Sequence, residues 1–458
     1  MSDEMTAIEA MPEDHTFDGW EELSWQERRE RRIAKWMAAP GVEFVDETVR
    51  AAYVERIQMV MDAVTLKKPV RVPVVPQTGF YTARYAGLTA KESMYDYDKL
   101  AAAWVKFYED MQPDFQSTDT YPGPVYDILG AKMINWPGHG VDDDSPWQFL
   151  EKEYMQAGDY DELIADPSAF FRRKLLPQYA DAFAGLGALD PFSDTMEAAS
   201  LPFTILGFAD PAVVESVQRL HEAANATLEY MGALMGCSGE TTARLGLPTL
   251  WGPTIKAPYD CIADTLRGTK GIVMDRYRQP EKIIAAAERF VPLQIDMAVR
   301  FSFFMESPLV CIPLHKGADG YMSDADFRTF YWPTLKAVLQ GIIDQGLVPW
   351  VFAEGGYNER LEAIVDRDLP TGAIMWWFDQ TDMVAAKQAL GGYAAIGGNV
   401  PSAMLALGDR AQVEAYVTKL LDDVAVDGGF VLGPGGMVDD AKPETMKAMI
   451  DTARRWAG

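Results

Sequence analysis

Four apolar runs between residues 309 and 399 decide the fold of this chain: LVCIPLHK (309–316), VPWVFAEGG (348–356), GAIMWWFDQTD (372–382) and YAAIGGN (393–399). A helical pattern follows each run, and each run stops at a polar residue. Short continuous apolar runs are typical of parallel strands that are buried on both faces. Strands that alternate with helices in this way predict a parallel sheet with right-handed crossovers, and we expect an α/β fold of the (β/α)8 barrel type.

The polar residues at the ends of these runs are candidates for a catalytic site, because a barrel gathers the carboxyl ends of its strands at one rim. They are His315, Glu354, Asp379 and Asn399. Glu354 is predicted to be a general acid or base with a raised pKa, or a metal ligand. An ion pair with Arg360 or His315 is the alternative. His315 would be a proton shuttle or metal ligand beside it, or else a histidine fixed by backbone hydrogen bonds.

Other residues of the predicted rim are candidates for binding a substrate. Lys316 would hold a carboxylate or be solvated, and Asn399 would orient a substrate or stabilise its own loop. Asp379 is expected to face the mouth, whereas Asp382 suits the N-cap of the next helix. Trp376 would supply a flat apolar wall, with core packing as the alternative. The first two strands are expected to add three residues to the ring, namely Gln77, Tyr81 and Asp119.

The composition is that of a globular protein with an acidic surface. Of 458 residues, 68 are acidic and 41 basic, which gives a net charge of −27. This charge argues against a nucleic acid or an anionic membrane as the main partner. No apolar run approaches the roughly 20 residues of a membrane helix, and the N-terminus lacks an apolar signal core. We therefore expect a cytoplasmic protein, in which Cys237, Cys261 and Cys311 are reduced and mostly buried.

The chain is expected to divide into a helical extension, residues 1–66, and a barrel, residues 67–458. The extension would pack on the barrel or on another subunit, so that a homodimer is one arrangement to test. Residues 134–171 are rich in Trp, Pro and Asp, and they indicate a long insertion that roofs the pocket. The run LPFTILGF (201–208) is predicted to be a strand between two helices.

The second half of the chain resembles the uroporphyrinogen decarboxylase superfamily, which also includes cobalamin-linked methyltransferases. The matching segments are FRTFYWPTLKAVLQGIIDQGLVPWVFAEGG (327–356), AAIGGNVPSAMLALGD (394–409) and GGFVLGPGGMVDDAKPETMKAM (428–449). Weaker matches are VPVVPQTGFY (72–81) and FQSTDTY (115–121). The resemblance implies a (β/α)8 barrel of the uroporphyrinogen decarboxylase type.

The substrate-binding pattern of the decarboxylase itself is incomplete in this chain. Gln77 and Tyr81 match its glutamine–glycine–tyrosine motif, and Asp119 matches the aspartate that grips the pyrrole nitrogens. Pro76 and Phe80, however, stand where the family has arginines that hold propionate groups. Without these cations, the polycarboxylate uroporphyrinogen is a poor fit to an acidic chain.

The thiol-directed methyltransferases of the superfamily bind zinc through a His-x-Cys pair and a late cysteine. Phe352 and Glu354 occupy the pair here, and Gly435 or Gly436 occupies the late position, so this zinc site is absent. The chain is similar to the decarboxylase-like branch that moves methyl groups from methoxylated compounds to a corrinoid protein. The resemblance therefore implies an O-demethylating methyltransferase, whose cobalamin is carried by a separate partner protein.

Three functions are consistent with these residues. In the first, the substrate is a small methoxylated compound, and aromatic methyl ethers are included. Glu354 and His315 either protonate its leaving oxygen or hold a divalent metal that assists the departure of that oxygen. Asp119, Asp379 and Asn399 would then orient the substrate. In the second, a cofactor-free decarboxylase or lyase uses Asp119 to stabilise a positive intermediate and His315 to deliver a proton. In the third, the barrel is not catalytic and docks another subunit.

Overall fold

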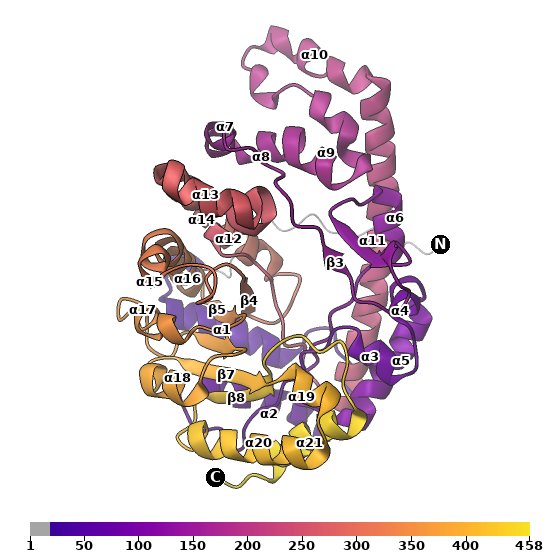
Figure 1. Ribbon diagram of the computed structural model, residues 1–458. Coiled ribbons are helices and arrows are strands. Elements are labelled where there is room, and N and C mark those ends of the chain that lie inside the picture. The colour runs from indigo at the N-terminus through magenta and orange to yellow at the C-terminus, as the bar shows by residue number, and fades with distance from the viewer. Residues whose placement is uncertain (1–18) are drawn as a thin grey trace.

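The computed structural model describes residues 19–458, so residues 1–18 of the predicted N-terminal extension lie outside it (Figure 1). Its centre is a parallel sheet of five strands in sequence order. All four apolar runs supply a strand, as predicted, and the fifth comes from residues near 430. The strands are β4 (Leu309–Leu314), β5 (Val348–Ala353), β6 (Met375–Phe378), β7 (Ala395–Val400) and β8 (Phe430–Pro434).

Three further segments, 72–78, 114–119 and 248–255, continue this sheet beyond both of its edges. The first segment bridges to β8 and to the second segment, the second bridges to the third, and the third bridges to β4. The parallel bridges that make these four connections are Val74–Leu432, Thr78–Thr118, Gln116–Thr249 and Thr254–Cys311. The protein is therefore an α/β fold organised around parallel pairing.

Helices follow the strands along the chain, as the alternating pattern predicts. They are α14 (Pro280–Phe301), α16 (Trp332–Asp344), α18 (Met383–Leu390), α20 (Arg410–Val424) and α21 (Pro443–Arg455). Asp382 is the N-cap of α18, because its side chain accepts hydrogen bonds from the backbone N–H groups of Val384 and Ala385. This confirms the capping role predicted for Asp382. No helix within residues 19–458 is long and apolar enough to cross a bilayer.

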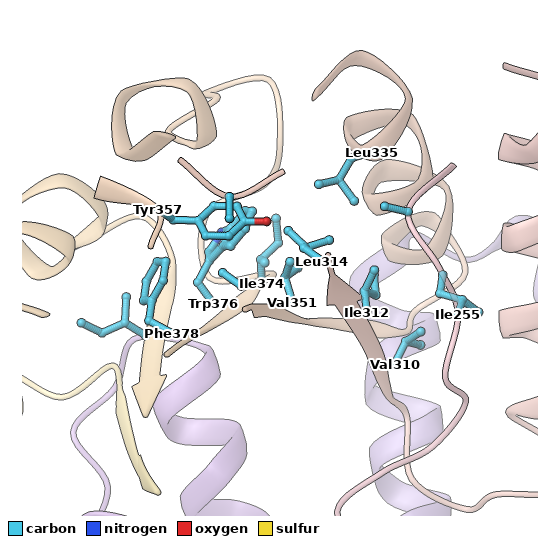
Figure 2. Close-up of a cluster of buried hydrophobic side chains, with 14 of the residues drawn as sticks. Ile255, Val310, Ile312, Leu314, Leu335, Val351, Tyr357, Ile374, Trp376 and Phe378 are labelled. Atoms are coloured by element: carbon cyan, nitrogen blue, oxygen red, sulfur yellow. The ribbon is translucent and has the colours of Figure 1, made fainter. Parts of the chain in front are cut away.

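Neighbouring residues of each strand pack into two different apolar clusters. The outer cluster contains Val351, Trp376 and Phe378 together with Leu335 of α16 (Figure 2). The inner cluster contains Trp350, Met375 and Trp377. Successive side chains of a strand point to opposite faces, so Trp376 and Trp377 are separated by the sheet itself.

The inner face is shaped to fit Trp377. A Cβ atom on Gly397 of β7 would lie 2.6 Å from the Trp377 ring, and one on Gly433 of β8 would lie 2.7 Å from it. The indole nitrogen donates a hydrogen bond to the carbonyl of Pro434 at 2.9 Å. The two glycines therefore leave the space that the large ring fills.

The N-terminal helices α1 (Trp25–Ala38) and α2 (Glu47–Val64) pack against the inner cluster. Ser24 and Glu27 form a capping box at the start of α1. The buried guanidinium of Arg29 donates to the carbonyl oxygens of Leu347 and Ala373, at 3.0 and 3.2 Å. Arginines of this helix therefore hold it to the amino-terminal ends of the strands.

A helical arm, defined here as residues 160–245, extends away from the sheet (Figure 1). It begins after a small sheet of β1 (Ile134–Pro137), β2 (Gly140–Val141) and β3 (Gln148–Phe149), and it includes α7 (Tyr160–Ala165), α8 (Pro167–Phe170), α9 (Leu176–Tyr179), α10 (Leu201–Thr204) and α11 (Pro211–Leu245). The predicted strand over 201–208 is wrong, because these residues form α10 and a 3-10 turn, η7 (Leu206–Ala209).

The physical reason for this error is the setting of the segment. An apolar run becomes a strand only where another strand can pair with it, and residues 201–208 pack against short helices instead. The other helices of the fold are α3 (Tyr81–Tyr85), α4 (Ala90–Tyr95), α5 (Tyr97–Met111), α6 (Gly123–Leu129), α12 (Pro258–Ile262), α13 (Gly268–Arg278), α15 (Asp324–Asp326), α17 (Leu361–Ile364) and α19 (Ser402–Leu407).

Candidate functional site

Glu354 and His315 lie side by side at the carboxyl ends of neighbouring strands. Leu314 of β4 pairs with Ala353 of β5, so the next residue of each strand emerges at the same height. The Nε2 atom of His315 lies 3.7 Å from Oε1 of Glu354, and the side chains are 30% and 43% exposed. The structure thus brings together the two residues that the sequence analysis placed at the centre of the site.

Two aspartates from the segment before β4 hold His315 in place. Asp264, on η8 (Ala263–Arg267), forms a hydrogen bond with Nδ1 of the imidazole. Asp260, on α12, is fully buried and accepts the backbone N–H groups of His315 and Lys316, at 2.9 and 3.0 Å. The proton of the ring therefore belongs on Nδ1 in the neutral form, and Nε2 is left facing Glu354.

The surroundings raise the pKa values of both partners. Burial lowers the pKa of His315, but the hydrogen bond that its ring donates to Asp264 and the charges of Asp260 and Glu354 outweigh this and raise it above the ordinary value. Burial raises the pKa of Glu354, and the charges of Asp260 and Asp379 add to that rise against the opposing effect of His315. Both groups consequently keep a proton to higher pH than they would in water, which suits proton donors.

Asp119 lies at the end of the strand segment 114–119, which bridges to the segments 72–78 and 248–255. Its backbone N–H donates to the carbonyl of Thr78 at 2.8 Å. Burial, with the charge of Asp439, raises the pKa of Asp119 to about 6. Burial also raises the pKa of the Cys311 thiol on β4, and the charges of Asp119 and Glu354 add to this effect. The charges of both carboxyl groups therefore reach the same thiol.

Asp379 completes the acidic rim. It follows β6, is half-buried, and accepts the backbone N–H of Gly355 at 3.1 Å. Burial raises the pKa of Asp379, and its charge in turn raises that of Glu354. The candidate site is therefore a group of carboxyl residues around one histidine.

Two predicted substrate-binding residues are occupied by other contacts. The amide of Asn399 donates to the carbonyls of Asp379 and Thr381, at 3.1 and 3.0 Å, and accepts the hydroxyl of Tyr416 at 2.9 Å. The ammonium group of Lys316 lies 2.8 Å from Glu151. The geometry thus favours loop stabilisation for Asn399 and an ion pair for Lys316.

The proposed aromatic wall at Trp376 is corrected by the structure. Trp376 is fully buried in the outer cluster, where its ring lies 6.3 Å from that of Phe378 and 6.4 Å from that of Trp332 (Figure 2). Its side chain points towards the helices and has no surface to offer a ligand. Both faces of this strand are apolar, so the sequence did not distinguish Trp376 from Trp377.

Gln77 and Tyr81 lie buried at and just after the end of the first strand segment, 72–78. The φ angle of Gln77 is +42°, and its Oε1 atom has no hydrogen-bond partner. The hydroxyl of Tyr81 is also buried without a partner, and burial raises its pKa. The Tyr81 ring packs edge-on against Phe107 at 5.8 Å. Buried polar atoms without partners are costly, which makes Gln77 a candidate for contact with a ligand.

Asp260 and Asp264 are site residues that sequence reasoning missed. Asp264 begins the segment DTLRGTK (264–270), which also carries Arg267 and Lys270. Arg267 pairs with Asp275, at 2.6 Å. Two long helices, α13 and α14, separate Asp264 from β4, and nothing in the sequence linked it to His315.

The donors of the site fall short of a metal centre. Within residues 19–458, no group of three or more His, Cys, Asp or Glu side chains is arranged to hold a metal ion. Glu354 and His315 supply two donors, and Asp264 orients the histidine as the partner of a metal-bound histidine usually does. A third protein ligand would be needed for a typical catalytic zinc site.

Two hollows lie at the N-terminal helices. One of ≈ 590 Å³ runs along α2 and includes Arg50 and Val70. Another of ≈ 430 Å³ lies between α1 and α2 and reaches Gly372. Neither contains Glu354, so the carboxyl cluster and its chemistry, rather than cavity size, define the candidate site.

Comparison with known proteins places the chain in a family. The family model for uroporphyrinogen decarboxylase (URO-D) matches residues 207–456, which is more than half of the chain. The protein therefore belongs to the uroporphyrinogen decarboxylase family, and the resemblance seen in the sequence is confirmed. A solved structure, a methyltransferase from Methanosarcina mazei, is similar with a TM-score of 0.57 over 89% of this chain and 99% of that chain. Their sequence identity is 13%, so this likeness concerns the fold. Comparison with curated proteins gives no match.

Proposed function

We propose that this protein is a methyltransferase that removes a methyl group from a small methoxylated substrate, with an aromatic ether as the favoured class. The acceptor would be a corrinoid carried by a separate protein. The observation that supports this proposal is the pairing of Glu354 with His315 at the end of β4 and β5. Both groups have raised pKa values and both stand in a rim of carboxyl residues.

The proposed architecture is a (β/α)8 barrel, residues 67–458, with an N-terminal helical extension. The bridges through segments 72–78, 114–119 and 248–255 support it, since they connect β8 back to β4 through parallel pairs. Such closure would bring Asp119, His315, Glu354 and Asp379 to one mouth. The arm and the residues near 134–171 would then form one long insertion after the second strand.

The charge of the mouth supports a neutral substrate. Asp119, Glu354 and Asp379 all have pKa values raised by burial, so the site disfavours the addition of further negative charge. The nearby cations Lys256 and Lys316 are already paired with Asp264 and Glu151. A methyl ether brings no charge to the site, whereas a polycarboxylate would be repelled.

In the proposed step, Glu354 donates a proton to the ether oxygen. The bond between that oxygen and the methyl carbon breaks, the bonding electrons stay on the oxygen, and the product is an alcohol or phenol. A corrinoid supplies the nucleophile that accepts the methyl group. Protonation matters because an alkoxide or phenoxide without a proton is a poor leaving group. His315 would then return a proton to Glu354 through the Nε2 atom that faces it.

The test is an O-demethylation assay of the whole chain. Methoxylated benzenes would be incubated with reduced cobalamin as the acceptor, and the phenol formed would be measured by chromatography. Glu354→Gln is expected to lower the rate by about 100-fold or more, the usual scale of general acid catalysis. Glu362→Gln is the matched control, because the Glu362 side chain is 92% exposed. Equal rates in the two variants would contradict the role of Glu354.

A decarboxylase or lyase is the second candidate, and the raised pKa of His315 favours it. A histidine whose pKa is raised keeps its proton to higher pH, and it can deliver that proton to a carbanion after carbon dioxide leaves. Asp119 would stabilise positive charge in the intermediate. Release of carbon dioxide from carboxylated aromatic compounds without any corrinoid, lost in His315→Gln, would replace the first proposal with this one.

A further inference from the structure

The tip of the arm exposes large apolar side chains that no other part of residues 19–458 covers. Here the tip means residues 192–208, which are η5 (Phe192–Asp194), η6 (Ala198–Ser200), α10 and η7. In Figure 1, α10 lies at the end of the arm that is farthest from the sheet. The following side chains are all between 51% and 89% exposed: Phe192, Met196, Leu201, Phe203, Ile205 and Leu206.

This exposed surface is as large as one side of a stable protein interface. A fully exposed large apolar side chain presents roughly 200 Å², so the six residues together offer on the order of 700–800 Å². A standard interface buries about 800 Å² on each partner, whereas the largest apolar patch on a monomer is typically about 300–600 Å². The tip therefore has the area that a specific partner would cover.

The charge around the tip indicates which kind of partner this is. Residues 189–218 contain Asp190, Asp194, Glu197, Asp210 and Glu215, and they contain no lysine or arginine. An apolar surface that binds membranes normally carries Lys and Arg around its apolar face. The acidic border therefore argues against an anionic lipid surface.

We propose that the tip is the interface of a homodimer, in which the tips of two copies meet across a two-fold axis. A two-fold contact uses the same patch on both subunits, so a single apolar patch is sufficient to form it. Because the arm holds its tip away from the rest of the chain, two tips can meet without contact between the two sheets (Figure 1). This proposal is independent of the chemistry proposed for Glu354.

The acidic border gives the dimer a characteristic dependence on salt. Two copies bring like charges together around an apolar centre, and salt screens the repulsion between them. Raising the salt concentration should therefore tighten the homodimer. A complex with a basic partner protein would show the opposite dependence.

The experiment is sedimentation equilibrium of the full-length protein over the micromolar range, at low and high salt. The wild type is expected to be a dimer whose dissociation constant falls as salt rises. The double variant Phe203→Ser/Leu206→Ser should raise that constant by about 100-fold, the effect of removing central interface residues. Leu407→Ser is the matched control, since Leu407 is 82% exposed on α19 far along the chain.

The folding of the tip variants is checked separately from their association. The tip residues are exposed, so the double variant should keep the circular dichroism spectrum and melting temperature of the wild type. Met196→Ser serves as a second, single variant at a residue that is 89% exposed. A monomeric wild type, a dimer that survives the tip variants, or binding of the tip to zwitterionic phospholipid vesicles would each contradict a homodimer at this surface.

Discussion

The imidazole of His315 and the carboxylate of Asp264 form a hydrogen bond that connects the end of β4 to η8. This bond occupies Nδ1 and leaves Nε2 as the only ring nitrogen that can exchange a proton with Glu354, 3.7 Å away. Lys256 also holds Asp264, with Nζ 2.9 Å from the other carboxylate oxygen. Asp264 is thus a positioning residue that acts on the site through His315.

Replacing Asp264 with Asn should lower the pKa of His315. The amide cannot supply the charge that stabilises imidazolium, while burial continues to favour the neutral ring. The pH at which activity is lost on the alkaline side should move to lower pH, and an NMR titration of His315 should move with it. Asp368→Asn, at a side chain that is 84% exposed, is the control. An unchanged pH profile in Asp264→Asn would contradict this role.

The stability of the protein should depend on His315 in a pH-dependent manner. The pKa of His315 is raised in the folded state, so protonation favours folding. This contribution is fully present below the ordinary histidine pKa of about 6.5 and is lost as pH rises through the folded value. Urea unfolding of wild type and His315→Gln should differ most at pH 5–6 and converge above neutral pH. A difference that grows with rising pH would show that the sign is wrong.

The contribution of Asp119 to stability should also be lost as pH rises, but at lower pH and because its charged form is the unfavourable one. Its folded pKa of about 6 lies above the ordinary aspartate value, so ionisation disfavours the folded state. Stability from this residue is present at low pH and is lost as pH rises from about 4 to 6. Asp119→Asn should therefore gain stability relative to wild type between pH 4 and pH 7, as measured by chemical denaturation. If the free energy of unfolding of Asp119→Asn falls relative to wild type over this interval, the folded state stabilises Asp119 as a charged group.

Replacing Asn399 with Ala should destabilise the protein rather than weaken substrate binding selectively. The change leaves the carbonyls of Asp379 and Thr381 without their partner, and the hydroxyl of Tyr416 keeps only the backbone carbonyl of residue 399. The expected cost is about 1–3 kcal/mol, against about 1–2 kcal/mol for Tyr416→Phe, which removes the hydroxyl that donates to both oxygens of Asn399. Urea unfolding measures both values. A large rise in KM with no loss of stability would restore the substrate role.

Much of the site was predictable because it depends on where strands end. A polar residue that closes an apolar run, such as His315 or Glu354, is a local signal, and parallel pairing places neighbouring ends at one height. Asp382 was predictable for a similar reason, because helix capping depends on a few adjacent residues. These features follow from short stretches of chain.

The remainder depends on contacts between distant segments. Asp264 meets His315 across 51 positions of the chain, and no short-range pattern encodes that contact. Trp376 and Trp377 were indistinguishable because a parallel strand is apolar on both faces. The strand predicted over 201–208 is wrong for a further reason, since this apolar run is exposed at the tip of the arm rather than buried.

The fit of Trp377 against Gly397 and Gly433 has a consequence for how this chain can change. β6 carries apolar side chains on both faces, but the fit against the two glycines concerns the inner face alone. There, a Cβ on Gly397 or Gly433 would lie within 2.7 Å of the Trp377 ring. Trp377, Gly397 and Gly433 lie on three successive strands and are matched in size. A larger residue at either glycine is therefore tolerated only together with a smaller one at position 377.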